Sequence, residues 1–189
     1  MRVLRAENYR RMPWKNGGGE TAEIAVSPDG AGLDDFDWRV SMARVERGGP
    51  FSTFPGVDRT LSILEGEGIL LGIEGRQSVT LTGASAAYSF PADARTNAEL
   101  VSGPITDLNV MTRRGRYGHK VGVHDVAGSM HLEISGDQAL LICGSGDLLA
   151  GGDRQEKLGR FDTAVLGGSG TLQIEGKARF FLIVFDRLV

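Results

Sequence analysis

Short runs in which apolar and polar residues alternate recur along the whole 189-residue chain, and each run is closed by Gly, Pro, Asp or Asn. Alternation with a period of two residues is typical of antiparallel strands that bury one face, and the closing residues are those of tight turns. Glycine adds to this pattern, because its 28 residues are about twice the average usage and are not periodic. No long amphipathic helical pattern is found, so we predict an all-β protein.

Twelve segments have the strand pattern. They are Glu20–Val26, Phe36–Val45, Leu61–Ile73, Ser78–Leu81, Ala86–Phe90, Ala98–Leu100, Ile105–Met111, His131–Ile134, Ala139–Cys143, Thr163–Leu166, Gly170–Ile174 and Arg179–Phe185. The last segment contains Phe180–Phe185, the longest apolar run, which is too short to span a bilayer and predicts a buried strand.

Two segments of the sequence echo each other. Ser62–Leu71 and Ala139–Leu149 each combine an apolar strand, a Gly-x-Gly turn and a second apolar strand. The echo predicts two related halves that join near Arg113–Ser129. We therefore expect an N-terminal unit at residues 1–112, which includes an entry segment, and a C-terminal unit at residues 113–189. The two units would pack together as one structural domain.

Charge and cysteine content narrow the classes of partner. A formal net charge of -3 argues against nucleic acid and anionic lipid as partners, because both attract a basic excess. Cys143 is the single cysteine, which excludes an internal disulfide and a zinc site built from cysteines and fits the cytoplasm. The first residues lack the apolar stretch of a secretory signal. We expect a small ligand or a protein partner, and a homodimer stays open.

The turn Leu64-Glu-Gly-Glu-Gly68 follows an apolar segment and resembles the glycine turn after the first motif of cupins. Four blocks of sequence resemble the signature blocks of the HutD/Ves family. They are residues 12–21, 36–43, 49–59 and 103–111. The resemblance implies a bicupin, that is, two double-stranded β-helix units of the RmlC-like jelly-roll type in one chain.

For function, the resemblance implies a cytoplasmic protein linked to bacterial histidine utilisation. Members of the family are regarded as regulators of the pathway that bind an intermediate such as urocanate or formylglutamate, and no established catalysis comes with the family. Some members of the family are instead described as stress-induced proteins, so the resemblance also implies this second role.

The positions that hold metal in cupins do not carry ligands here. Placed by the glycine turn, the two histidine positions fall within residues 52–55, and the glutamate position falls on Arg59. A guanidinium has no lone pair to offer a metal ion. The three histidines, His119, His124 and His131, lie outside both motif regions. We predict no metal and no other cofactor.

Arg59 also changes the kind of ligand that a site inside the barrel would bind. The guanidinium has five N–H donors and can pair with a carboxylate in a bidentate arrangement, so Arg59 favours an anionic ligand. The alternative is a structural salt bridge in which Asp58 pairs with Arg59 or with a neighbour, and the sequence leaves it open.

Two expected strands carry polar residues on one face only. Arg39 and Ser41 alternate with apolar residues in one strand, and Asp107 and Asn109 do so in another. A solvent-facing surface is the ordinary explanation of such a pattern. The resemblance favours a ligand site instead, because these positions belong to the signature blocks.

Trp14, Lys15 and Asn16 precede three glycines ahead of the first expected strand. The glycines would let the backbone N–H groups approach a ligand, and Lys15 would add a positive charge. The order of residues is not that of a phosphate loop. A flexible entry loop anchored by the tryptophan is the alternative.

We predict a small-molecule-binding regulatory protein that binds a carboxylate-bearing metabolite of histidine degradation without metal. Arg39, Arg59 and Lys15 would neutralise the ligand, while polar residues orient it and aromatic residues form an apolar wall. The full set of predicted ligand-binding residues is Trp14, Lys15, Asn16, Arg39, Ser41, Phe51, Phe54, Arg59, Asp107 and Asn109.

Two alternatives remain. One is a metal-free cupin enzyme, an isomerase or hydrolase acting on a small acid, with Asp107 as general base. The sequence offers no histidine placed to move protons and no nucleophile beside a base, so no catalytic residue is assigned in the leading hypothesis. The other is a stress-linked interaction protein that has no small ligand.

Overall fold

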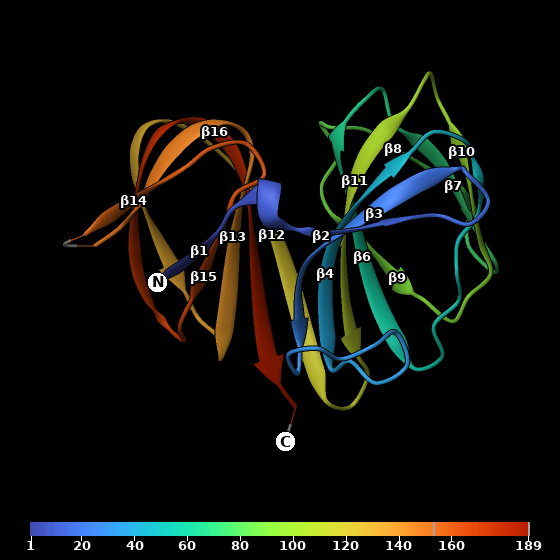
Figure 1. Ribbon diagram of the computed structural model, residues 1–189, viewed down its shortest axis with the longest axis horizontal. Coiled ribbons are helices and arrows are strands. Elements are labelled where there is room, and N and C mark those ends of the chain that lie inside the picture. The colour runs from blue at the N-terminus through green and yellow to red at the C-terminus, as the bar shows by residue number, and fades with distance from the viewer. Residues whose placement is uncertain (153, 189) are drawn as a thin grey trace. The chain divides into compact units, whose positions relative to one another are not determined.

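The computed structural model describes residues 1–152 and 154–188. Within them the chain forms sixteen strands and one short 3₁₀ helix, η1, and divides into two compact units. The central unit is Arg10–Arg116, and the terminal unit joins Met1–Tyr9 to Tyr117–Val189 (Figure 1). The prediction of an all-β protein is confirmed. No helix in the described part of the chain is long and apolar enough to cross a membrane.

The central unit contains two antiparallel sheets. The six-stranded sheet has the order β2-β3-β4-β11-β6-β9, and the four-stranded sheet has the order β5-β10-β7-β8. The strands are β2 (Arg10–Pro13), β3 (Gly19–Ser27), β4 (Trp38–Val45), β5 (Gly49–Pro50), β6 (Val57–Glu65), β7 (Ile69–Ile73), β8 (Val79–Leu81), β9 (Tyr88–Pro91), β10 (Thr96–Leu100) and β11 (Ile105–Arg113).

The two sheets of the central unit share an apolar core. Residues of β4, β6, β9 and β11 pack there with residues of β7, β8 and β10. Leu61 and Leu71, one from each sheet, are fully buried. Alternation along each strand brings every second side chain into this core, which is the physical reason for the period of two in the sequence.

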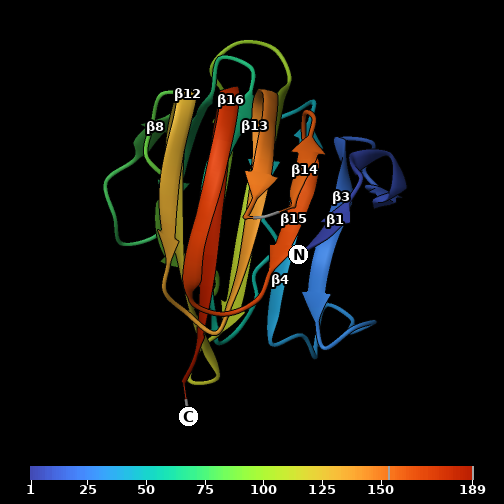
Figure 2. The same ribbon diagram turned by 90° about the vertical axis from the view of Figure 1, so that its left-hand side faces the viewer.

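The terminal unit is one sheet with the order β1-β15-β13-β16-β12, and β14 pairs with β13. Its elements are β1 (Arg2–Leu4), η1 (Ala6–Asn8), β12 (Tyr117–Ile134), β13 (Gln138–Gly151), β14 (Gln155–Leu158), β15 (Thr163–Leu166) and β16 (Gly170–Arg187). Figure 2 shows β12, β16 and β13 side by side as long curved strands. Its core cluster is apolar throughout.

The strands of the terminal unit are longer than the sequence pattern predicts. The segments expected at Gly170–Ile174 and Arg179–Phe185 are one strand, β16, and the glycine between them lies inside it. Gly176 has a φ of 147° and is paired on both sides, with Gly128 and with Leu148. Glycine here allows the strand to bend while its pairing continues, whereas the sequence pattern was interpreted as a turn.

The two Gly-x-Gly echoes lie where a strand changes its neighbours. Before the first echo β6 pairs with β9 and β11, and after it β7 pairs with β8 and β10. The second echo, Gly144-Ser-Gly146, forms a bulge inside β13, which pairs with β15 before it and with β14 after it. At each echo the chain therefore changes the strands with which it pairs. The first echo does so by a break between β6 and β7, and the second does so by a bulge inside β13.

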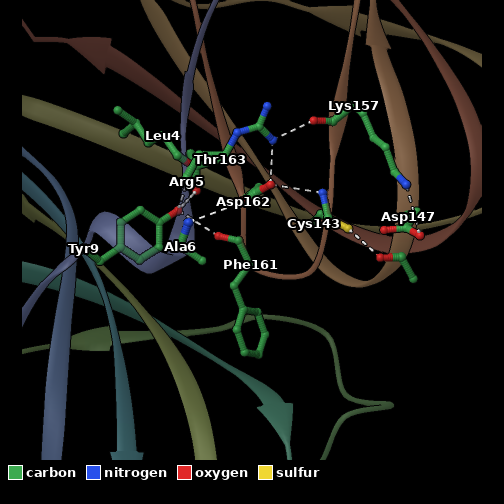
Figure 3. Close-up of polar contacts among 12 residues, drawn as sticks. Leu4, Arg5, Ala6, Tyr9, Cys143, Asp147, Lys157, Phe161, Asp162 and Thr163 are labelled. Carbon is green, nitrogen blue, oxygen red and sulfur yellow. Dashed lines mark hydrogen bonds and ion pairs between the residues drawn. The ribbon is translucent and has the colours of Figure 1, made fainter.

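The first nine residues belong to the terminal unit, which differs from the expected division at residue 112. β1 pairs with β15, and Tyr9 is buried. The Tyr9 hydroxyl donates to Phe161 O at 2.7 Å and lies 2.7 Å from Thr163 Oγ1 (Figure 3). The Asp162 carboxylate accepts hydrogen bonds from Arg5 Nη1, Ala6 N and Gly159 N. These contacts join the first nine residues to residues 159–163. The alternation of apolar and polar residues along the sequence does not predict such a long-range contact.

We expect Asp162→Asn to lower the free energy of unfolding of the terminal unit by about 1–3 kcal/mol, because an amide presents donors where the carboxylate accepts three hydrogen bonds. Urea unfolding would measure this loss, and limited proteolysis should cut residues 1–9 sooner. Asp147→Asn is the matched control, because Asp147 faces Lys157 at 3.7 Å on the surface and should change stability by less than about 1 kcal/mol. Equal losses in the two variants would contradict the anchoring role of Asp162.

Candidate functional site

The polar residues expected in two strands lie together inside the central unit. On β11, Met111 is opposite Arg39 of β4 and Arg59 of β6, and Asn109 is opposite Ser41 of β4. Residues directly opposite each other in a sheet point to the same face. This face also carries core residues such as Leu61, so it is the interior of the unit and not a solvent-facing surface.

We call Arg39, Ser41, Arg59, Asp107 and Asn109 the interior polar cluster. Their exposed fractions are 5%, 2%, 7%, 1% and 8%, so all five are buried. The terminal unit has no such group: among its described residues the hydroxyl-bearing side chains that are buried are those of Tyr9 and Thr163, and no charged side chain is buried. A buried charge is costly unless it is paired, so a cluster of charges in one unit only indicates a site.

Arg39 has a partner inside the protein that sequence reasoning missed. Its Nε lies 2.8 Å from Glu23 Oε2 on β3, and its Nη1 lies 3.3 Å from Ser41 Oγ. The side chains of Arg39 and Glu23 are 6% and 16% exposed. The signal was present, because Glu23 alternates with apolar Ala22 and Ile24 as Arg39 and Ser41 alternate with their neighbours.

Arg59 differs from Arg39 because it lacks a carboxylate partner. Within the described residues its guanidinium donates only to Met111 Sδ, 3.4 Å from Nη2, and its buried Nε has no hydrogen-bond partner. The guanidinium lies over the rings of Phe51 and Phe54, at 5.2 and 5.4 Å from their centroids. Burial lowers the pKa of Arg59 to about 10, against the opposing charge of Asp107.

The two rings come from the segment between β5 and β6, which is tied to the sheets by its backbone. Phe51 N donates to Thr96 O and Phe54 N donates to Ala92 O, each at 2.9 Å. Both side chains are half-buried. The structure therefore brings Phe51 and Phe54 to the guanidinium of Arg59, and the expectation that they form the apolar wall of a ligand site stays a prediction.

Asp107 is the acidic member of the cluster. Its carboxylate accepts a hydrogen bond from Asn109 Nδ2. Burial raises the pKa of Asp107 from its ordinary value of 3.8 to about 7, while the charge of Arg59, the bond from Asn109 and a bond with the Ala43 backbone act in the opposite direction. Near neutral pH this carboxyl group is therefore poised between its two protonation states.

The raised pKa predicts a pH dependence of stability. Between about pH 4 and pH 7 the folded state holds a proton that the unfolded state has released, so stability should fall as the pH rises through this window. Asp107→Asn should remove this slope, which amounts to at most about 4 kcal/mol. Urea unfolding at a series of pH values measures the slope, and an unchanged slope in the variant would contradict the burial argument.

Trp14, Lys15 and Asn16 form a tight turn between β2 and β3. Trp14 Nε1 donates to Thr21 Oγ1 at 2.8 Å, and Asn16 Oδ1 accepts from Gly18 N at 3.0 Å. Gly17 N donates to Trp14 O, so the N–H groups of two of the three glycines are used within the turn. Lys15 and Asn16 are exposed. The structure does not bring them into the interior polar cluster and favours the anchored entry loop.

Asp58 does not pair with Arg59, which removes the alternative that the sequence left open for that pair. The Asp58 carboxylate lies 2.7 Å from Arg114 Nη2, and both groups are exposed. Neighbouring residues of a strand point to opposite faces, so Arg59 is directed inward while Asp58 is directed outward.

The three histidines lie on β12 in the terminal unit. They are five and seven residues apart on one strand, which places their Cα atoms about 16 and 23 Å apart. His124 stacks on Phe180, with 5.1 Å between ring centroids. Among the residues that the structure describes, no three His, Cys, Asp or Glu side chains gather where they could hold a metal ion.

Antiparallel sheets around a shared core, with a buried cluster of polar groups on one inner face, define a protein of the cupin type. The chain aligns with a cupin 2 conserved barrel domain protein from Leptotrichia buccalis at a TM-score of 0.58 and 11% identity, over 93% of this chain and 95% of that one, which shows the fold alone. The HutD family model matches residues 6–183, and the chain belongs to the HutD family.

Relatives of known sequence and structure agree with this assignment. A 21.2 kDa protein of Pseudomonas putida, named for its place in the hutC 3′ region, is 37% identical over 186 residues, 97% of this chain and 96% of its own. Protein Ves of Citrobacter koseri is 42% identical over 123 residues, 62% of each chain. HutD from Pseudomonas fluorescens SBW25, solved in a formate condition, has a TM-score of 0.85 and 31% identity, with 98% of each chain covered. The resemblance inferred from the sequence blocks is confirmed.

Proposed function

We propose that this protein binds a small carboxylate-bearing metabolite at Arg59 and acts as a regulatory binding protein of histidine degradation. The observation that carries the proposal is the state of Arg59: its buried guanidinium lies over the rings of Phe51 and Phe54, and among the described residues a thioether is its only hydrogen-bond acceptor. A carboxylate would accept two parallel hydrogen bonds from it and neutralise its charge.

The energetics support a ligand at this position. A buried cation without a hydrogen-bonded carboxylate costs several kcal/mol of stability, as an order of magnitude, and a ligand carboxylate would offset this cost. Phe51 and Phe54 supply the apolar wall, while Asp107 and Asn109 can orient the polar remainder of the ligand. The link to histidine degradation rests on family membership and on the hutC context in the name of the Pseudomonas putida relative. Urocanate and formylglutamate are the candidate ligands, and the cytoplasm is the proposed place of action.

A thermal-shift screen with formate, urocanate, formylglutamate, glutamate and histidine tests the proposal. A ligand that binds only the native state raises the melting temperature, and at a concentration 100 times its Kd it adds about 2.7 kcal/mol of stability. We expect at least one acid to raise the melting temperature, and histidine methyl ester, which lacks a carboxylate, to have no effect. If none of the acids shifts the transition, the stress-linked interaction protein without a ligand becomes the better hypothesis.

A second candidate function is favoured by one observation, the pKa of Asp107. A carboxyl group with a pKa of about 7 in a buried site has the value that suits a general base at neutral pH. The chain would then be a metal-free isomerase or hydrolase of a small acid. Incubation of the bound acid with the protein, followed by product analysis, tests this candidate. Turnover that Asp107→Asn abolishes would support it, and an unchanged acid would leave binding as the function.

A further inference from the structure

The interior polar cluster contains two guanidinium groups, but they are not equivalent. Arg39 is held by Glu23, with 2.8 Å between Nε and Oε2, and both side chains are largely buried. Its Nη1 is directed to Ser41 Oγ at 3.3 Å. Arg59 has no carboxylate of the protein in this role. The site therefore contains one guanidinium that already carries a carboxylate and one that does not.

The position of Glu23 depends on a bulge in β3. Before the bulge Glu23 is opposite Ser41, and after it Val26 is opposite Arg39. The side chain of Glu23 therefore reaches diagonally along the sheet to Arg39, a separation that long side chains can bridge. Without this glutamate, no other acidic residue of β3, β4, β6 or β11 on the inner face would stand beside Arg39.

The two arginines are close enough to take the two ends of one small molecule. Both are opposite Met111 on the flanking strands, so their Cα atoms are two strand spacings apart, about 10 Å. The charge of Arg39 also lowers the pKa of Arg59, which reflects their proximity. A ligand with two carboxylates would have to share Arg39 with Glu23, which already takes the Nε of that guanidinium.

We propose that Glu23 is a specificity-determining residue, an internal carboxylate that occupies Arg39 and restricts the site to ligands with a single carboxylate. This inference rests on the proposed function. A second ligand carboxylate at Arg39 would meet Glu23, and like charges brought together in a buried site cost several kcal/mol, as an order of magnitude. Of the two candidate metabolites, urocanate has one carboxylate and formylglutamate has two, so the inference favours urocanate.

Isothermal titration of butyrate and glutarate, a matched pair of acids with one and two carboxylates, tests the inference. In the wild-type protein we expect butyrate to bind at least about tenfold more tightly than glutarate. In Glu23→Gln we expect the affinity for glutarate to rise about tenfold or more, because Arg39 becomes free to pair with the second carboxylate, while butyrate changes by less than about threefold.

Glu20→Gln is the matched control, because Glu20 lies on the same strand, pairs with Arg11 at 2.9 Å and is more exposed. It should leave both affinities unchanged. If Glu23→Gln keeps the wild-type ratio of the two affinities, the inference is wrong and the proposed function stands. If the wild-type protein binds glutarate as tightly as butyrate, the inference is wrong whatever the variant does. If the wild-type protein binds neither acid and none of the screened metabolites, the proposed function itself fails.

Discussion

Arg59→Met should raise the free energy of unfolding of the ligand-free protein by about 1–3 kcal/mol and abolish carboxylate binding. Replacing a buried charge that no carboxylate contacts by an apolar side chain of similar length removes the cost of keeping that charge out of water. Methionine would pack between Phe51 and Phe54 and beside Met111, where Arg59 now lies. A residue that lowers stability while it enables binding is the signature of a functional position. Urea unfolding and titration with the acid found in the thermal-shift screen measure the two effects.

The same substitution at a second arginine provides the control. Arg113 also stacks over a phenylalanine, at 5.4 Å from the Phe36 centroid, but its Nε and Nη2 donate to the backbone oxygens of Phe36 and Asp34. Arg113→Met should therefore destabilise the protein by about 1–2 kcal/mol, because it leaves acceptors without donors. A loss of stability in Arg59→Met as large as that in Arg113→Met would contradict the proposal that Arg59 binds the carboxylate of a ligand.

Gly68→Ala should destabilise the central unit by about 3 kcal/mol or more. Gly68 ends the Gly-x-Gly turn between β6 and β7 and has a φ of 118°, which residues with a Cβ rarely adopt. A Cβ atom at this position would clash with the backbone oxygen of Leu81, so backbone would have to move as well. Strain in φ and a backbone clash add to each other here. Urea unfolding would measure the loss.

Gly75→Ala separates the two causes. Gly75 has a φ of 76°, yet a Cβ atom there would meet nothing within 4 Å. Only the cost of the left-handed conformation remains, about 1–2 kcal/mol. A similar loss in the two variants would show that the close approach of β8 to Gly68 contributes nothing, and the turn would then be an ordinary one.

Much of the fold could be predicted from the sequence, because strand formation depends on local patterning. The alternation of apolar and polar residues along β4 and β11 correctly indicated two strands with a polar face. The glycine turn at Leu64–Gly68 and the family blocks correctly indicated a cupin-type fold. The glycines inside β13 and β16 were misinterpreted as turns. Glycine is used both in turns and at bends where strand pairing continues, so the residue type alone does not distinguish the two.

The candidate site was predicted only in part. The sequence by itself determined which side chains share a face: Arg39 with Ser41, and Asp107 with Asn109, because the period of a strand fixes them. The resemblance to cupins also predicted that Arg59 stands where cupins carry a metal ligand, which stays a prediction. Whether these faces point to solvent or inward depends on which other strands cover them, and alternation along one strand carries no information about that.

Only the tertiary structure decided which groups are paired. It joined Arg39 to Glu23 across the β3–β4 register and left Arg59 between two aromatic rings. It used the N–H groups around Asn16 inside a turn, and it placed the first nine residues beside β15, more than 150 residues away in the chain. The physical reason is that register, bulges and burial arise from contacts between distant strands, and these contacts determine which buried charges are paired within the protein.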